Sequence, residues 1–257
     1  MSSFFKPLTL LALLSILGAT ACSRAGDAAP RQLIVASASD MVNALPELAK
    51  DFQARTGVKV VPSFGPSGAL AQQIASGAPF DVFLSADRRF VAKLVESKFI
   101  DPSSRVVYAI GHLVLYSPQV HLGELADLRR PEVRRFSIAN PELAPYGRAA
   151  KQALERAGLW NEVQGKVVVA ENIRQTLQMV ESGNVDAALT SLSLVSGSSP
   201  AGGTLLHVPE NLYDQIQQEA GIIARANGNR DARAFLDYLA GANGKIILER
   251  YGFGLPK

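Results

Sequence analysis

Residues 58–77 read VKVVPSFGPSGALAQQIASG and combine two kinds of local pattern. Three of the first four residues are valines, and such a β-branched segment is typical of a strand. After the small turn Gly65-Pro66-Ser67-Gly68, Leu70 and Ile74 recur at the spacing of one helix face. Residues 81–85 are then predicted to form another short strand, with an apolar centre at 82–84. A strand, a helix and a second strand in succession predict a parallel α/β sheet.

The same alternation continues along the chain and starts again after an apolar stretch at 106–116. The first helix is expected to begin near Val42, because Pro46 is tolerated only in a first turn. Two successive runs of strand and helix predict two α/β lobes joined by two crossings, with lobe 1 formed by 32–111 and 225–257 and lobe 2 by 112–224. The other elements that we expect are strands at 32–36, 135–139, 166–170, 187–190 and 221–225, helices at 88–98, 147–157 and 173–182, and two C-terminal helices.

The N-terminus has the pattern of an export signal. Residues 1–21 carry one lysine, a short apolar core and an Ala-Thr-Ala end, too short to span a bilayer as a stable helix. Cys22 follows directly and resembles the lipidated cysteine of a bacterial lipobox, although Ala19 stands where leucine is usual. Lipidation of Cys22 would tether the protein to a membrane, with 22–31 as a linker. The alternative is plain cleavage after Ala21 and a soluble periplasmic protein.

Composition excludes several classes of function. The chain has 257 residues, 47% hydrophobic and 19% charged, with a net charge of +3, which is ordinary for a globular protein. Its basic residues are scattered, so no nucleic-acid partner is expected. One cysteine allows no intrachain disulfide, and His112, His121 and His207 lack metal-ligand spacing. No glycine-rich dinucleotide motif follows a strand, and no cofactor is expected.

Ligands of α/β sheets bind outside the carboxyl ends of the strands, where helices begin. Four predicted helix starts share neutral, small or amide-bearing residues and free backbone N–H groups, which suit a small anion. Any one of them alone is more often an ordinary helix cap, and Asn172 with Gln175 has the pattern of a capping box. The four segments are Ala36–Asp40, Gly65–Gly68, Asn140–Gly147 and Glu171–Gln175.

Five segments carry a resemblance to a known family. The most specific is GAPFDVFLSAD at 77–87, and the others are VASAS at 35–39, SFGPS at 63–67, PYGRAA at 145–150 and RYGF at 250–253. With nearly everything after residue 32, they resemble the periplasmic molybdate-binding proteins of ABC importers, within the type II solute-binding family. The resemblance implies two mixed sheets flanked by helices, a ligand cleft between the lobes, a monomer, an inner-membrane ABC permease as partner and no enzymatic activity. Localisation in the periplasm or cell envelope is expected.

The resemblance also implies the ligand and its contacts. In the family two lobes close on molybdate or tungstate, with two serines from one lobe and backbone amides from the other. Carried over by position, the serines are Ser39 and Ser67, and the amides are those of Tyr146 or Gly147 and of Ile173. The molybdenum would be reached only through its oxide oxygens, so no side chain is a metal ligand.

A third hydroxyl is left open by the sequence. The family's commonest form has a tyrosine in the strand at 187–191, where this chain has Thr190, and Tyr146 falls where that form has a small residue. Either Tyr146 or Thr190 could supply the missing hydroxyl, and Tyr146 is our first expectation.

Two further alternatives follow from individual residues. Asp40 beside Ser39 would repel a dianion but accept the proton of hydrogen phosphate, so another oxyanion of the phosphate or sulfate type is an alternative ligand. We expect Asp40 instead to point to solvent from a helix start. Gly65–Ala69 approximates a nucleophile elbow, and Asp186 and His207 follow in the chain order of an exported serine hydrolase using Ser67. Ala69 breaks that pattern.

Overall fold

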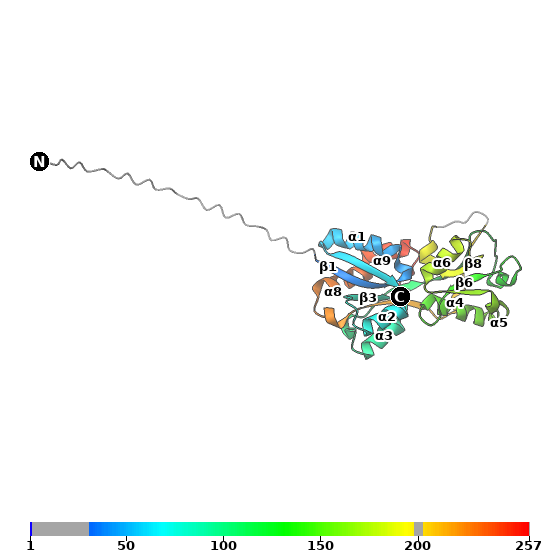
Figure 1. Ribbon diagram of the computed structural model, residues 1–257, viewed down its shortest axis with the longest axis horizontal. Helices are drawn as coiled ribbons and strands as arrows, with labels where there is room; N and C mark the ends of the chain where they lie inside the picture. Colours follow the sequence, from blue (N-terminus) through cyan, green and yellow to red (C-terminus); the bar gives the residue numbers. More distant parts are fainter. Residues whose placement is uncertain (2–30, 198–202, 257) are drawn as a thin grey trace.

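The computed structural model describes residues 31–197 and 203–256, together with Met1. Two lobes lie side by side in Figure 1, and each has a five-stranded sheet with helices packed on it. Residues 2–30 lie outside the described residues, and they include the rest of the expected signal peptide, Cys22 and the linker as far as residue 30. None of the helices that the structure describes is long and apolar enough to cross a membrane.

The sheet of lobe 1 has the order β2-β1-β3-β10-β4. β1 pairs in parallel with β2 and β3, whereas β10 is antiparallel to β3 and β4, so the sheet is mixed. Its strands are β1 (Gln32–Ala38), β2 (Lys59–Gly65), β3 (Val82–Ser85), β4 (Val106–Gly111) and β10 (Ile216–Ile222). Its helices are α1 (Ala44–Thr56), α2 (Ser67–Ala75), α3 (Arg88–Glu96), α8 (Arg230–Ala240) and α9 (Ala242–Arg250).

Helices cover both faces of this sheet, because side chains alternate along each strand. Leu33 and Val35 of β1 belong to a core shared with α1, α8 and α9, whereas Ile34 and Ala36 lie in the core under α2 and α3. Figure 1 shows α1 and α9 on one side of lobe 1 and α2 and α3 on the other. α1 begins at Ala44, so Pro46 lies in its first turn as predicted.

Lobe 2 repeats this plan. Its sheet has the order β7-β6-β8-β5-β9, with β6 parallel to β7 and β8, and β5 antiparallel to β8 and β9. Its strands are β5 (Leu113–Ser117), β6 (Phe136–Ala139), β7 (Val167–Ala170), β8 (Ala187–Ser191) and β9 (Thr204–His207). Its helices are α4 (Pro145–Arg156), α5 (Trp160–Val163), α6 (Ile173–Glu181) and α7 (Leu192–Val195). The implied architecture of two mixed sheets flanked by helices is confirmed.

Short 3-10 turns connect several of these elements. The one that matters for the site is Ser39–Met41, between β1 and α1. The others are Pro102–Ser104, Leu125–Arg129, Gln164–Lys166, Glu210–Leu212 and Ala224–Ala226.

The chain crosses between the lobes twice, and one expected boundary is wrong. The first crossing lies between β4, which ends at Gly111, and β5, which begins at Leu113. We assigned residues 112–224 to lobe 2, but β10 is hydrogen-bonded to β3 and β4 of lobe 1. The second crossing therefore precedes Ile216, and the strand expected at 221–225 begins five residues earlier.

The first part of this strand was not predicted, because the polar run Gln217-Gln218-Glu219 interrupts the apolar pattern. Two of these side chains are nevertheless buried, each with a specific partner. The amide oxygen of Gln218 accepts a hydrogen bond from the Tyr108 hydroxyl at 3.1 Å, and Glu219 forms an ion pair with Arg105 at 2.5 Å. Polar side chains can be buried in a central strand when each has a hydrogen-bond or ionic partner. Here the partners come from distant parts of the chain, so the local sequence does not reveal them.

Candidate functional site

Residues of both lobes line a small cavity of about 10 Å³ between them, roughly the space of one water molecule. Lobe 1 contributes the ends of β1, β2 and β3, and lobe 2 contributes the beginnings of α4 and α6. This is the position at which α/β sheets bind ligands. The lining residues are Ala38, Ser39, Asp40, Gly65, Pro66, Ser67 and Ala86 from lobe 1, and Ala144, Pro145, Tyr146 and Ile173 from lobe 2.

The cavity is lined almost entirely by neutral groups. Among the described residues at its wall, Asp40 is the only one with a carboxyl, and none is a lysine or arginine. α2 and α4 begin there without a side-chain cap, which leaves backbone N–H groups at their positive dipole ends. α6 is capped as predicted: the Asn172 side chain accepts from the backbone N–H of Gln175 at 3.0 Å. Such an arrangement favours a small anion held by neutral donors.

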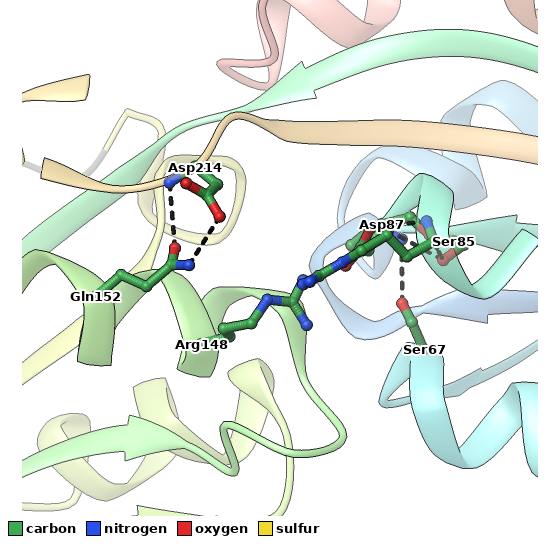
Figure 2. Close-up of polar contacts among 8 residues, drawn as sticks. Ser67, Ser85, Asp87, Arg148, Gln152 and Asp214 are labelled. Atoms are coloured by element: carbon green, nitrogen blue, oxygen red, sulfur yellow. Dashed lines mark hydrogen bonds and ion pairs between the residues drawn. The ribbon is translucent and has the colours of Figure 1, made fainter. Parts of the chain in front are cut away.

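Ser67 lines this space and has a hydroxyl proton that it can donate. It is the first residue of α2 and is fully buried, and its hydroxyl oxygen accepts a hydrogen bond from the Ala86 N–H at 3.0 Å (Figure 2). Since a serine hydroxyl has one proton to donate, this bond leaves the proton available to an acceptor. Ser39 is 5% exposed, and its side chain has no hydrogen bond to any residue that the structure describes.

Tyr146 lines the cavity from lobe 2, and its phenol extends into the crossing region. The residue is 1% exposed, and its hydroxyl lies 3.4 Å from the side-chain nitrogen of Gln218. The Tyr146 hydroxyl packs against Gly111 at the end of β4. A β-carbon at residue 111 would overlap this hydroxyl, so glycine makes room for it. Burial and the nearby Asp40 carboxyl raise the pKa of Tyr146 well above its usual range, so the phenol keeps its proton.

Two other predicted contacts do not line the cavity. Thr190 in β8 is fully buried, and its hydroxyl has no hydrogen-bond partner in the described part of the chain. Gly147 packs against the carbonyl of Ala139 so closely that a β-carbon would overlap that group. The structure thus brings Ser39, Ser67, Tyr146 and Ile173 together at the cavity wall, and Gly147 and Thr190 are not among the lining residues.

The expectation that Asp40 points to solvent is wrong, because its exposure is 0%. Asp40 lies in the 3-10 turn Ser39–Met41, which is buried in front of α1, and not in the exposed first turn of a helix. One carboxyl oxygen accepts from the Gln218 side chain at 2.6 Å, and the other is buried without a partner among the residues that the structure describes. Burial raises the pKa of Asp40 from 3.8 to about 6, although the nearby Tyr146 hydroxyl and Gln218 amide oppose the rise.

The two lobes touch beside the cavity, and sequence analysis missed these contacts. The Gly68 N–H at the start of α2 donates to the Leu143 carbonyl of lobe 2 at 2.9 Å. A β-carbon at residue 68 would lie 3.0 Å from that carbonyl, so glycine permits the close approach. Arg148 of α4 forms an ion pair with Asp87 of lobe 1, and Figure 2 shows its side chain extending between the lobes. The loop after β3, with Ala86 and Asp87, could have been found by applying the strand-end rule to that strand too.

The serine hydrolase alternative is not supported by the geometry. The hydroxyl of Ser67 is bonded to the Ala86 N–H, and no histidine is near it in the cavity wall. Asp186 accepts from two backbone N–H groups in lobe 2, at 2.8 and 3.0 Å, and His207 is exposed on β9. No group of three metal-binding side chains occurs among the residues described.

Known proteins are similar to this chain both in sequence and in fold. The family model of the bacterial extracellular solute-binding protein matches residues 33–254. The molybdate-binding protein ModA of Azotobacter vinelandii is 38% identical over 250 residues, 96% of this chain and 98% of that protein. ModA of Rhodobacter capsulatus is 33% identical, with 88% and 89% covered. The solved periplasmic molybdate-binding protein of A. vinelandii superposes with a TM-score of 0.82 at 33% identity, covering 88% of this chain and all of that one.

Proposed function

Because the chain belongs to the family of bacterial extracellular solute-binding proteins, we propose that it binds molybdate between its lobes and presents it to an ABC importer. The observation that carries this is the cavity at which strand ends of lobe 1 meet helix starts of lobe 2. Relatives named for molybdate binding support the choice of anion. These relatives are binding proteins and not enzymes. Tungstate is proposed as a second ligand, since its size and charge are nearly the same.

The proposed contacts divide between side chains and backbone. Ser39 and Ser67 donate their hydroxyl protons from lobe 1, and the backbone N–H groups of Tyr146 and Ile173 donate from lobe 2. A ligand that bridges the two lobes in this way holds them in contact, which is how binding in a cleft couples to closure. The metal atom is recognised only through its oxide oxygens.

We also propose that the protein works in the periplasm or cell envelope as a monomer. The signal-like residues 1–21 and the family's extracellular character support export. Lipidation of Cys22 would keep the protein near an inner-membrane permease, with the linker giving it reach. Mass spectrometry of the protein purified from membranes tests the anchor through the mass of its N-terminal peptide.

A thermal-shift panel of molybdate, tungstate, sulfate, phosphate and chromate tests the ligand. A ligand that binds only the folded protein stabilises it by mass action, by about 2.7 kcal/mol at a hundred times the Kd. We expect molybdate and tungstate to raise the melting temperature at micromolar concentrations and sulfate and phosphate to need far more. Strong stabilisation by phosphate that molybdate does not compete away would contradict the proposal.

A ligand of the hydrogen phosphate type is a second candidate, and Asp40 is the observation in its favour. An ionised carboxyl in the cavity wall could accept the proton that hydrogen phosphate carries and molybdate dianion lacks. The same panel separates the two candidates, since phosphate would then outrank both molybdate and sulfate.

The substitutions Tyr146→Phe and Thr190→Val test the third hydroxyl. Each removes one hydroxyl and keeps most of the side-chain volume. We expect Tyr146→Phe to weaken molybdate binding more than Thr190→Val does, because Tyr146 lines the cavity and Thr190 does not. Titration calorimetry measures both. The opposite order would assign the role to Thr190, and two unaffected variants would mean that backbone amides alone hold that side of the anion.

A further inference from the structure

Asp40 is a fully buried residue of the wall of the proposed anion cavity, and its carboxyl lies beside Gln218 and Tyr146. Its Oδ2 accepts from Gln218 at 2.6 Å, whereas its Oδ1 is buried and meets no donor of good geometry among the described residues, although the Tyr146 hydroxyl and the backbone N–H groups of the turn lie near the carboxyl. A carboxylate oxygen removed from water without a partner is costly. The wall of the anion site therefore contains a carboxyl with one oxygen that lacks a well-formed hydrogen bond within the described part of the chain.

The elements around Asp40 offer it no positive charge. β4 presents Tyr108, whose hydroxyl donates to Gln218 of β10, and α4 presents the phenol of Tyr146. Ser193 of α7 donates to the backbone carbonyl of Asp40 at 2.7 Å. Both phenols are buried and have a raised pKa, so both stay neutral.

The charged side chains of the neighbouring helices are engaged or exposed. Arg148 of α4 is paired with Asp87, and Arg174 of α6 is exposed. β2 ends in Ser63, Phe64 and Gly65, which carry no charge, and Glu219 of β10 is paired with Arg105. Nothing among these described groups compensates a negative charge on Asp40.

A dianion and an ionised carboxyl in one small cavity would repel each other strongly, because little water separates them. Protonation of the carboxyl removes this repulsion and converts Oδ1 or Oδ2 from an acceptor into a donor. We propose that Asp40 takes up one proton when the oxyanion binds, so that its neutral carboxyl donates a hydrogen bond to the bound dianion. This inference rests on the proposed function.

The sign of the pH dependence follows from linkage. In the free protein the pKa of Asp40 is about 6, so the carboxyl is mostly ionised above that pH. The bound dianion raises this pKa further. Between the two values each binding event takes up a proton, and the affinity falls about tenfold per pH unit as the pH rises. Below pH 6 the carboxyl is already protonated, and the affinity levels off.

Calorimetric titration of the intact protein with sodium molybdate measures this directly. Titrations at pH 7.5 in buffers of different ionisation enthalpy count the protons, and we expect an uptake approaching one per molybdate. From pH 6 to pH 8 the affinity is expected to fall by about 50-fold. Asp40→Asn keeps the shape and cannot titrate, so its affinity should be independent of pH and its proton uptake absent.

Asp214→Asn is the matched control, since Asp214 is an exposed carboxyl bonded to Gln152 and Arg156, outside the cavity wall. It should keep the pH dependence of the unaltered protein. Tight molybdate binding by the unaltered protein without proton uptake would overturn the inference and leave the proposed function standing, and so would uptake that persists in Asp40→Asn. If neither protein binds molybdate at any pH between 6 and 8, the proposed function itself fails.

Discussion

The double variant Ser39→Ala, Ser67→Ala is expected to bind molybdate on the order of 10²- to 10⁴-fold more weakly than the unaltered protein. A hydrogen bond to a charged ligand contributes roughly 1.5–3 kcal/mol, which is about ten- to a hundredfold in affinity for each single variant. The two losses should add approximately, provided that each hydroxyl contacts a different part of the anion. Calorimetry of the two single variants and the double variant measures each step.

The two serines differ in what their loss does to the free protein. The hydroxyl of Ser67 also accepts from the Ala86 N–H, so Ser67→Ala leaves a buried donor unpaired and should lower stability by about 1–3 kcal/mol. Ser39 has no such bond among the described residues, so Ser39→Ala should change affinity with little change in melting temperature.

Ser137→Ala is the control for removing a buried hydroxyl. Ser137 lies in β6 and donates to the Thr176 carbonyl at 3.0 Å, and it does not line the cavity. We expect this variant to lose some stability and to bind molybdate normally. If Ser39→Ala and Ser67→Ala also bind molybdate normally, the two serines do not donate hydrogen bonds to the anion, and their role is limited to the local structure of the helix starts.

Local patterns predicted much of this architecture, because in an α/β protein each strand and helix buries its own apolar face. The strand-end rule also led to the correct helix starts, since the ends of parallel strands lie at one edge of a sheet. Ser39, Ser67, Tyr146 and Ile173 therefore meet at one cavity although 134 positions separate the first from the last.

The errors concern polar residues whose partners are distant in sequence. The start of β10 was not predicted, because Gln218 is polar and its partners Tyr108 and Asp40 come from other parts of the chain. Asp40 was expected at the surface because an aspartate near a helix start is usually exposed. Its burial depends on the 3-10 turn and on the crossing strands, which no local pattern indicates.

The second large effect that we expect is on stability: in the absence of ligand, Asp40→Asn should be more stable than the unaltered protein at pH 7.5. The pKa of Asp40 rises from 3.8 to about 6 on folding. The folded state therefore holds this proton more tightly than the unfolded state, and stability is lost as the pH rises between these two values. At 1.36 kcal/mol per unit, the loss is roughly 3 kcal/mol once the pH exceeds 6.

An asparagine at position 40 carries no such cost. Its side-chain oxygen can still accept from Gln218, and its shape matches that of the protonated carboxyl. The free energy of unfolding, measured in urea at pH 7.5 and again near pH 4, should therefore differ between the two proteins mainly at the higher pH. Contributions from other titrating groups occur in both proteins and cancel in the difference.

Glu219→Gln, in the neighbouring strand β10, is expected to have the opposite effect on stability. Glu219 is buried as Asp40 is, but Arg105 compensates its charge at 2.5 Å. Its neutralisation removes one partner of a buried pair and should destabilise the protein at pH 7.5. Neutralising the carboxyl at position 40 would then raise the free energy of unfolding, and neutralising the one at position 219 would lower it, because only Glu219 has a cation beside it. Should Asp40→Asn also destabilise the free protein at pH 7.5, the charge on Asp40 must be compensated there, and the reason for it to take up a proton on binding would disappear.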